Sequence, residues 1–153
     1  MEFPIEFYTR LESDAGIQAQ WSCWSGNSET AVAIPPEFAG PGGGLSPEDL
    51  FNQALINCFV GTFKVYAEKS KVSFDKLLAQ SKLVVAPDEQ GRPVMKRLEV
   101  RVQIQNPSHP DRALRLAQKA SESGFILNSV HTECHFEFEL VQNQTHQSNE
   151  LET

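Results

Sequence analysis

The stretch that most constrains this chain runs from Gly42 to Ala67 and reads GGGLSPEDLFNQALINCFVGTFKVYA. Ser46 and Asp49 have the spacing of a capping box, and Pro47 suits a first helical position, so a helix is predicted to begin here. Its apolar residues occupy most faces instead of one stripe, which is typical of a helix buried on most sides. At about 1.5 Å per residue this helix would be roughly 35 Å long, so the rest of the chain is predicted to wrap around it.

Alternating apolar and polar residues predict the strands around this helix. The predicted strands cover residues 3–11, 17–23, 30–34, 77–85, 94–104 and 130–140. A second, shorter helix is predicted over residues 111–123, where Gly124 ends it as a C-terminal cap. Because helices and strands are segregated along the chain, the predicted class is α+β with antiparallel sheets. Residues 1–141 are predicted to form a single domain, and the polar residues 142–153 a disordered tail.

The composition excludes several classes of partner. A net charge of −7 argues against nucleic acid and against an anionic membrane surface. No apolar run approaches the roughly 18 residues of a membrane-spanning helix, and the acidic N-terminus is unlike a signal peptide, so a cytoplasmic location is expected.

Neither a metal nor a cofactor is predicted. The three cysteines, Cys23, Cys58 and Cys134, are widely spaced and form no CxxC pair. His131, Glu133 and His135 lie at two-residue steps on one strand face, about 6.6 Å apart, which indicates a solvated face and not a chelate. The glycines before the long helix lack the Lys and Ser/Thr of a phosphate-binding loop.

The length of the predicted central helix also bears on assembly. A helix so long and apolar is hard to cover with 153 residues, so a second copy is predicted to help cover it in an obligate homodimer. The alternative is a monomer in which half of the helix faces solvent.

The run PEDLFNQALINCF resembles the signature of the OsmC/Ohr family, the osmotically inducible protein C and organic hydroperoxide resistance proteins. In that family a Pro-Glu-x-Leu helix start is followed, ten residues after the Glu, by a reactive cysteine, and Glu48 and Cys58 have this spacing. The resemblance implies an intertwined dimer in which antiparallel sheets wrap two central helices. It also implies reduction of organic hydroperoxides by the cysteine, through a disulfide with a second cysteine that a dithiol reopens.

Carried onto this chain, the resemblance makes Cys58 the peroxidatic residue and Glu48 the residue that holds a cation beside it. Ten helical residues span about 15 Å, so Glu48 must act from the partner chain or through an intermediary. The aromatic residues are mostly expected in the core, with Phe38, Phe51 and Phe59 the candidates for lining an apolar substrate pocket beside the thiol.

This sequence departs from the family pattern at two positions. Gly124 stands where the second cysteine is expected, and Glu37, just before Phe38, stands where several members carry an Arg. Cys134 could replace the missing thiol, and the missing cation could come from any of three arginines, Arg10, Arg92 or Arg97.

Three functions therefore remain open. One is a one-cysteine peroxidase whose Cys58 is reduced by an external thiol, acting on small organic hydroperoxides. The second is a non-catalytic dimer that binds a small apolar ligand at its interface, with Cys58 as an inert wall. The third is a redox sensor whose Cys58 is modified without turnover.

Overall fold

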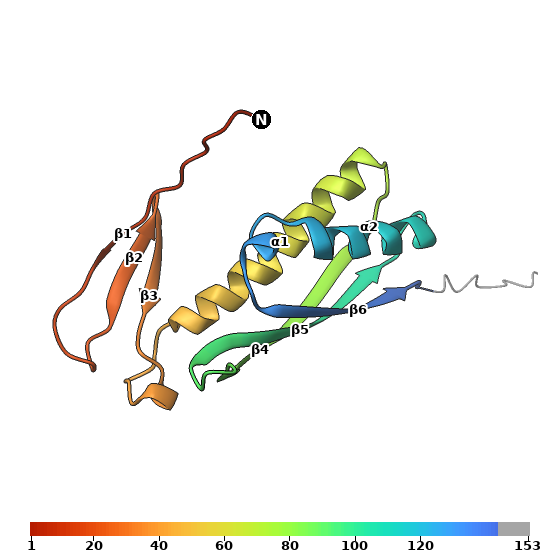
Figure 1. Ribbon diagram of the computed structural model, residues 1–153. Helices are drawn as coiled ribbons and strands as arrows, with labels where there is room; N and C mark the ends of the chain where they lie inside the picture. The colour runs from red at the N-terminus through yellow and green to blue at the C-terminus, as the bar shows by residue number, and fades with distance from the viewer. Residues whose placement is uncertain (144–153) are drawn as a thin grey trace, which may run out of the picture. The chain divides into compact units, whose positions relative to one another are not determined.

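The computed structural model describes residues 1–143 and divides the chain into two compact units, Met1–Gln53 and Ala54–Thr153. Figure 1 shows their secondary structure elements. Most of the predicted tail lies outside the described residues. Its first two residues are bonded to the body of the chain, because Gln142 donates to the Pro107 carbonyl at 3.3 Å and Asn143 to Asn106 Oδ1 at 2.7 Å.

The first unit contains a three-stranded antiparallel sheet in the order β1-β2-β3. The strands are β1 (Arg10–Glu12), β2 (Trp21–Ser25) and β3 (Ser28–Val32), followed by a short 3-10 turn, η1 (Pro36–Phe38). The three predicted strands are confirmed in order, but the first was predicted to begin at residue 3. Residues 1–9 are exposed and pair with no strand in the described part of the chain. Alternation gives them an apolar side, but a strand forms only where a neighbour accepts its hydrogen bonds.

The long helix α1 (Pro47–Lys69) begins where the capping signals predicted. The Asp49 amide donates to Ser46 Oγ at 3.0 Å, and the Ser46 amide donates to Asp49 Oδ2 at 2.9 Å. This reciprocal pair is the predicted capping box, with Pro47 at the first helical position.

The second unit contains the rest of α1, a second sheet, helix α2 (Pro110–Ser123) and a 3-10 turn, η2 (Leu127–Ser129). The sheet has the order β4-β5-β6, with β4 (Lys76–Pro87), β5 (Pro93–Gln105) and β6 (Glu133–Val141). Strands β4 and β5 are antiparallel, whereas β5 and β6 are parallel, so the prediction of wholly antiparallel sheets is wrong at this pair. A helical crossover returns the chain to the starting end of the sheet, and α2 provides it. The α+β class is confirmed.

Helices α1 and α2 cover one face of this sheet (Figure 1). The core beneath them is made by fully buried side chains of three elements: Leu55, Phe59, Phe63 and Ala67 of α1, Leu98, Val100, Val102 and Ile104 of β5, and Ala113, Ala117 and Ala120 of α2. The four buried residues of α1 recur every fourth position and form one stripe. The prediction that α1 is buried on most sides is therefore not met within this single chain.

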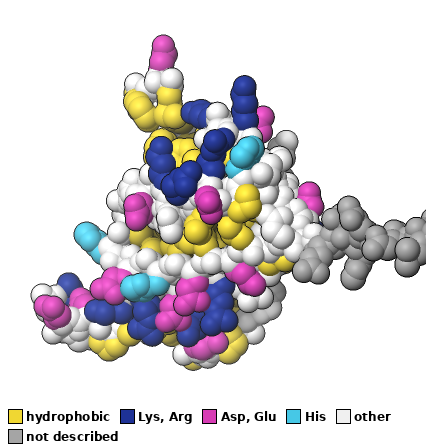
Figure 2. Space-filling model, turned by 90° about the vertical axis from the view of Figure 1, so that its right-hand side faces the viewer, with side chains coloured by type: hydrophobic (Ala, Val, Ile, Leu, Met, Phe, Trp, Pro, Cys, Tyr) yellow, Lys and Arg dark blue, Asp and Glu magenta, His cyan; other side chains and the backbone are white. Residues whose placement is uncertain are grey.

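The other face of the second sheet is charged and exposed, as Figure 2 shows in the lower part of its view. Lys82 pairs with Glu99 at 2.7 Å and Arg101 with Glu137 at 3.6 Å. His135, predicted to lie on a solvated face, is exposed there. Within the described residues, no helix has the length and apolar character needed to cross a membrane.

Candidate thiol site on helix α1

Cys58 is half-buried on the side of α1 that faces the end of α2. Gly124, the residue that follows α2, contacts it there. A Cβ built on Gly124 would lie 2.5 Å from Cys58 Sγ and 3.3 Å from both Thr62 Oγ1 and Leu127 Cδ1. The sulfur therefore packs directly against the backbone of Gly124, with no room for a side chain between them.

The backbone of Gly124 gives no other reason for a glycine. The residue ends α2 as predicted, but its φ of −67° and ψ of 141° are an extended conformation that any L-residue adopts. The predicted cap is confirmed at Gly124, but its conformation is not the left-handed one that commonly requires a glycine at a helix end. Space, and not backbone conformation, is what a glycine provides at this position.

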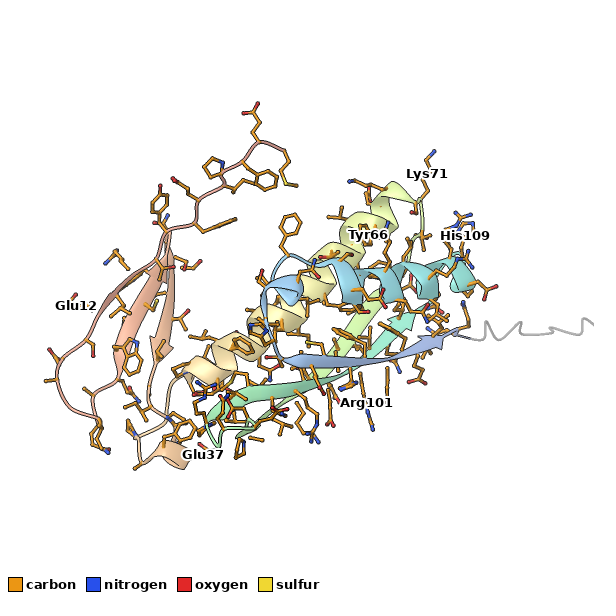
Figure 3. The ribbon with its side chains drawn as sticks, viewed as in Figure 1. Glu12, Glu37, Tyr66, Lys71, Arg101 and His109 are labelled. Carbon is orange, nitrogen blue, oxygen red and sulfur yellow. The ribbon has the colours of Figure 1, made fainter. Side chains whose placement is uncertain are left out.

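A line of polar groups runs along α1 from the thiol. Thr62, one turn after Cys58, donates its hydroxyl to the Cys58 carbonyl at 2.8 Å. Tyr66, a further turn along and labelled in Figure 3, shares a 2.6 Å hydrogen bond with Ser123 of α2. The Lys119 ammonium lies 4.6 Å from the centre of the Tyr66 ring. Sequence reasoning missed this line, although the four-residue spacing of positions 58, 62 and 66 places them on one helix face.

Apolar side chains are exposed immediately beyond Gly124. Phe125 is 66% and Ile126 44% exposed, while Leu127, which contacts the Gly124 position, is half-buried. Exposed aromatic and aliphatic groups next to a half-buried thiol are the chemistry that favours an apolar ligand. The sequence offered no periodic signal for this apolar rim, defined by Phe125 and Ile126.

Glu48 lies in the first turn of α1, in the first unit, whereas Cys58 belongs to the second. One carboxylate oxygen of Glu48, Oε2, is buried and has no hydrogen-bond partner among residues 1–143. A buried carboxylate oxygen left without a donor is costly, so this oxygen is suited to a donor from outside the described chain. The predicted joint role of Glu48 and Cys58 stays a prediction.

The three predicted pocket residues have different surroundings. Phe38, next to Glu37 (labelled in Figure 3), ends η1 and is 54% exposed, and Phe51 is half-buried; both belong to the first unit. Phe59 is fully buried, with its ring centroid 5.0 Å from that of Phe136 and 5.8 Å from that of Phe138. These are the contacts of a core residue. A pocket lined by the three rings stays a prediction.

Each candidate source of a cation is engaged with a neighbour. The Arg10 guanidinium lies 4.3 Å from the centre of the Trp24 ring. Arg92 pairs with Asp88 at 3.0 Å, and Arg97 pairs with Glu99 at 3.2 Å.

The other two cysteines are free and half-buried. Cys134 donates to the Thr132 carbonyl at 3.5 Å, and burial raises the pKa of its thiol, so at neutral pH it is the less reactive, protonated form that prevails. Among residues 1–143, no three His, Cys, Asp or Glu side chains are grouped so that they could hold a metal ion.

These features define a small α+β protein in which a long capped helix presents one thiol to the glycine end of a second helix. The sequence model described as OsmC-like protein matches residues 40–139, and the chain belongs to this family.

Two relatives of similar sequence are named as uncharacterized proteins. The chain is 33% identical to YmaD of Bacillus subtilis over 61 residues, 40% of this chain and 41% of YmaD, so this match spans less than half of the relative. It is 26% identical to a protein of Acinetobacter baylyi over 115 residues, 74% of this chain and 78% of the relative.

Several solved structures share the fold. An OsmC-like protein of unknown function from Vibrio cholerae has a TM-score of 0.77 at 18% identity, covering 89% of this chain and 100% of that one. An organic hydroperoxide resistance protein from Legionella pneumophila has a TM-score of 0.63 at 21% identity, covering 90% and 99%. The organic hydroperoxide resistance protein OhrB of Bacillus subtilis has a TM-score of 0.58 at 20% identity, covering 88% and 98%.

Proposed function

We propose that this OsmC-like protein reduces organic hydroperoxides through Cys58 and that an external thiol restores the reduced enzyme. The observation that carries the proposal is the position of Cys58. Its sulfur is half-buried at the junction of α1 and α2, and the apolar rim of Phe125 and Ile126 begins one residue from its contact with Gly124. Two proteins of similar fold are named organic hydroperoxide resistance proteins, which supports the same chemistry here.

The first step consumes one hydroperoxide. The Cys58 thiolate attacks the outer peroxide oxygen, an S–O bond forms, and the O–O bond breaks. The leaving alkoxide takes a proton and departs as the alcohol, while the sulfur becomes a sulfenic acid. The apolar rim would hold the organic group, and the half-buried setting would limit competing water.

The test compares cysteine variants in peroxide consumption. Purified protein is mixed with cumene hydroperoxide and dithiothreitol, and residual peroxide is measured over time. Cys58→Ser is expected to abolish consumption, while Cys23→Ser and Cys134→Ser, which remove the other half-buried thiols, serve as matched controls and should retain it. Without reductant, intact mass should show a gain of about 16 Da, one oxygen, that Cys58→Ser prevents. Equal consumption by the Cys58→Ser variant would refute the proposal.

The apolar rim also supports a second candidate function, the binding of an apolar ligand without chemistry. Exposed large apolar groups grouped at one place often mark a binding site. This function predicts that cumyl alcohol, the unreactive product, binds equally well to the unmodified protein and to Cys58→Ser, with no peroxide consumed by either. Formation of the sulfenic acid separates the enzyme and the sensor from this binder, and sustained turnover with thiol separates the enzyme from the sensor.

The active form is proposed to be a homodimer. Residues 1–9 expose Phe3, Ile5 and Phe7 at alternate positions, and α1 buries only one stripe of its apolar surface within this chain. Exposed apolar surface of this kind is usually covered by a partner, and a second copy supplies one. Light scattering after size exclusion should give twice the 17.1 kDa chain mass. Phe7→Glu should weaken the dimer, and Tyr8→Glu, at the exposed neighbouring position, is the matched control.

A further inference from the structure

A second concave surface, separate from the thiol site, lies between α2 and β6. It is an open groove of about 690 Å³, and neither Cys58 nor Gly124 lines it. Charged side chains of α2 form one wall, and side chains of β6 that point toward the core form the floor. The lining includes Arg115, Lys119 and Glu122 of α2, and Cys134, Phe136 and Phe138 of β6. Small-molecule sites typically enclose about 300–1,000 Å³, so the groove has the size of a ligand site.

The floor of the groove is an apolar strip that the fold leaves partly uncovered. Strand β6 is an edge strand, paired only with β5 among the described residues. Phe136 and Phe138 are half-buried, and their rings are stacked with centroids 6.0 Å apart. Cys134 continues the strip, and burial raises the pKa of its thiol, as expected beside apolar groups. From position 134 to position 138 the strip is about 13 Å long, enough for an extended hydrocarbon chain.

The two ends of the groove carry opposite charge. Helix α2 and strand β6 run in opposite directions (Figure 1), so Arg115 lies toward the Phe138 end of the strand and Glu122 toward the Cys134 end. Arg115 is exposed and has no hydrogen bond or ion pair with any of residues 1–143. Lys119, between them, holds its ammonium 4.6 Å from the centre of an aromatic ring of α1. Arg115 is therefore the cation available to a ligand.

We infer that this groove binds a carboxylate that carries an extended apolar chain. The carboxylate is held by the guanidinium of Arg115, which suits it as a two-pronged donor. The chain lies over Phe138 and Phe136 and ends near Cys134, where it covers apolar surface that water otherwise contacts. Glu122 repels a carboxylate from that end, so charge fixes the direction of the ligand. This binding involves no reaction and does not rest on the proposed peroxidase function.

The test uses Cys134 as a reporter inside the groove. In the full chain carrying Cys23→Ser and Cys58→Ser, Cys134 is the single thiol, and its alkylation by iodoacetamide is followed by intact mass. Decanoate is expected to slow this alkylation at least fivefold at saturation, because its chain covers the sulfur. Equilibrium dialysis of decanoate against the unmodified chain measures its binding without any substitution, and circular dichroism checks that each variant is folded.

Two comparisons test the charged end of the groove. Arg115→Glu is expected to raise the half-saturating concentration of decanoate at least fivefold, because an anion replaces the cation that holds the carboxylate. Arg112→Glu is the matched control and should leave that concentration unchanged. Arg112 is exposed on the same helix, but its guanidinium donates to the Ser70 carbonyl at 3.3 Å and does not line the groove. The neutral 1-decanol, with the same chain, should protect Cys134 only at higher concentration.

Three results would overturn the inference: no protection of Cys134 by decanoate in the folded protein, equal half-saturation with Arg115 and with Arg115→Glu, or equal protection by 1-decanol. Alkylation of Cys134 that slows as protein concentration rises, with no decanoate present, would assign the groove to a second copy of the chain and would also overturn it. The test protein lacks the Cys58 thiol and meets no peroxide, so failure of the proposed function leaves these outcomes unchanged.

Discussion

Replacing Gly124 with alanine should destabilise the protein mainly through the contact with Cys58. The new methyl carbon would lie 2.5 Å from Cys58 Sγ, and unbonded heavy atoms separate by about 3.5–4.0 Å, so one group must move by more than about 1 Å. Overpacking of this kind costs about 1–3 kcal/mol. Because φ is −67°, alanine has no backbone strain here and should gain about 0.4–1 kcal/mol by restricting the unfolded chain. The expected net loss is about 1–2 kcal/mol.

A double-mutant cycle isolates this contact. In a Cys58→Ala background the sulfur is gone, so Gly124→Ala should become neutral or stabilising by up to about 1 kcal/mol. The assay is urea unfolding followed by circular dichroism at one protein concentration, because a dimer's stability depends on concentration. In each background, the protein with Gly124 and the Gly124→Ala variant should show the same m-value, so that their free energies of unfolding can be compared. The same loss from Gly124→Ala in the two backgrounds would refute the contact between residues 58 and 124.

Three further changes test other parts of the structure. Ser46→Ala removes the hydroxyl that accepts from the Asp49 amide and should cost about 1 kcal/mol in urea unfolding, whereas Ser46→Thr, which keeps an acceptor, should cost less. Phe59→Ala should cost about 3–5 kcal/mol because the ring is fully buried, and a near-neutral result would favour the pocket role predicted for it. Burial raises the pKa of the Cys134 thiol, so its alkylation by iodoacetamide in a Cys23→Ser, Cys58→Ser protein should rise at higher pH than in the same protein in urea; coincident pH profiles would contradict this.

The start of α1 was predictable because its signals are local. Ser46, Pro47 and Asp49 act on each other within one turn, so their spacing alone specifies the capping box. The order of strands and helices was predictable for a similar reason, because apolar periodicity is read over a few residues. The length of β1 was not predictable from the sequence. Alternation specifies which side of a segment is apolar, but it does not show whether a neighbouring strand is present to complete the hydrogen bonds.

The site was less predictable, because it depends on contacts between distant segments. Cys58 and Phe59 are adjacent in sequence, yet about 100° apart around the helix, so one faces α2 and the other the core. That difference places the Cys58 thiol at the junction with α2 and the Phe59 ring in the core. Gly124 ends α2 as its position after the apolar periodicity predicted, but its distance to Cys58 Sγ, which gives a reason for its small size, depends on a contact that the sequence does not show.

The buried face of α2 has a consequence for the chemistry at its end. Ala113, Ala117 and Ala120 are completely buried, so the side chains that α2 buries most fully are methyl groups. Short side chains at a contact allow helices to approach toward the near end of the usual 8–10 Å spacing. A valine or leucine at any of the three positions would push α2 away from the elements it packs on. This displacement would increase the distance between Gly124 and Cys58 Sγ. Three residues with no reactive group therefore set the space around Cys58 Sγ.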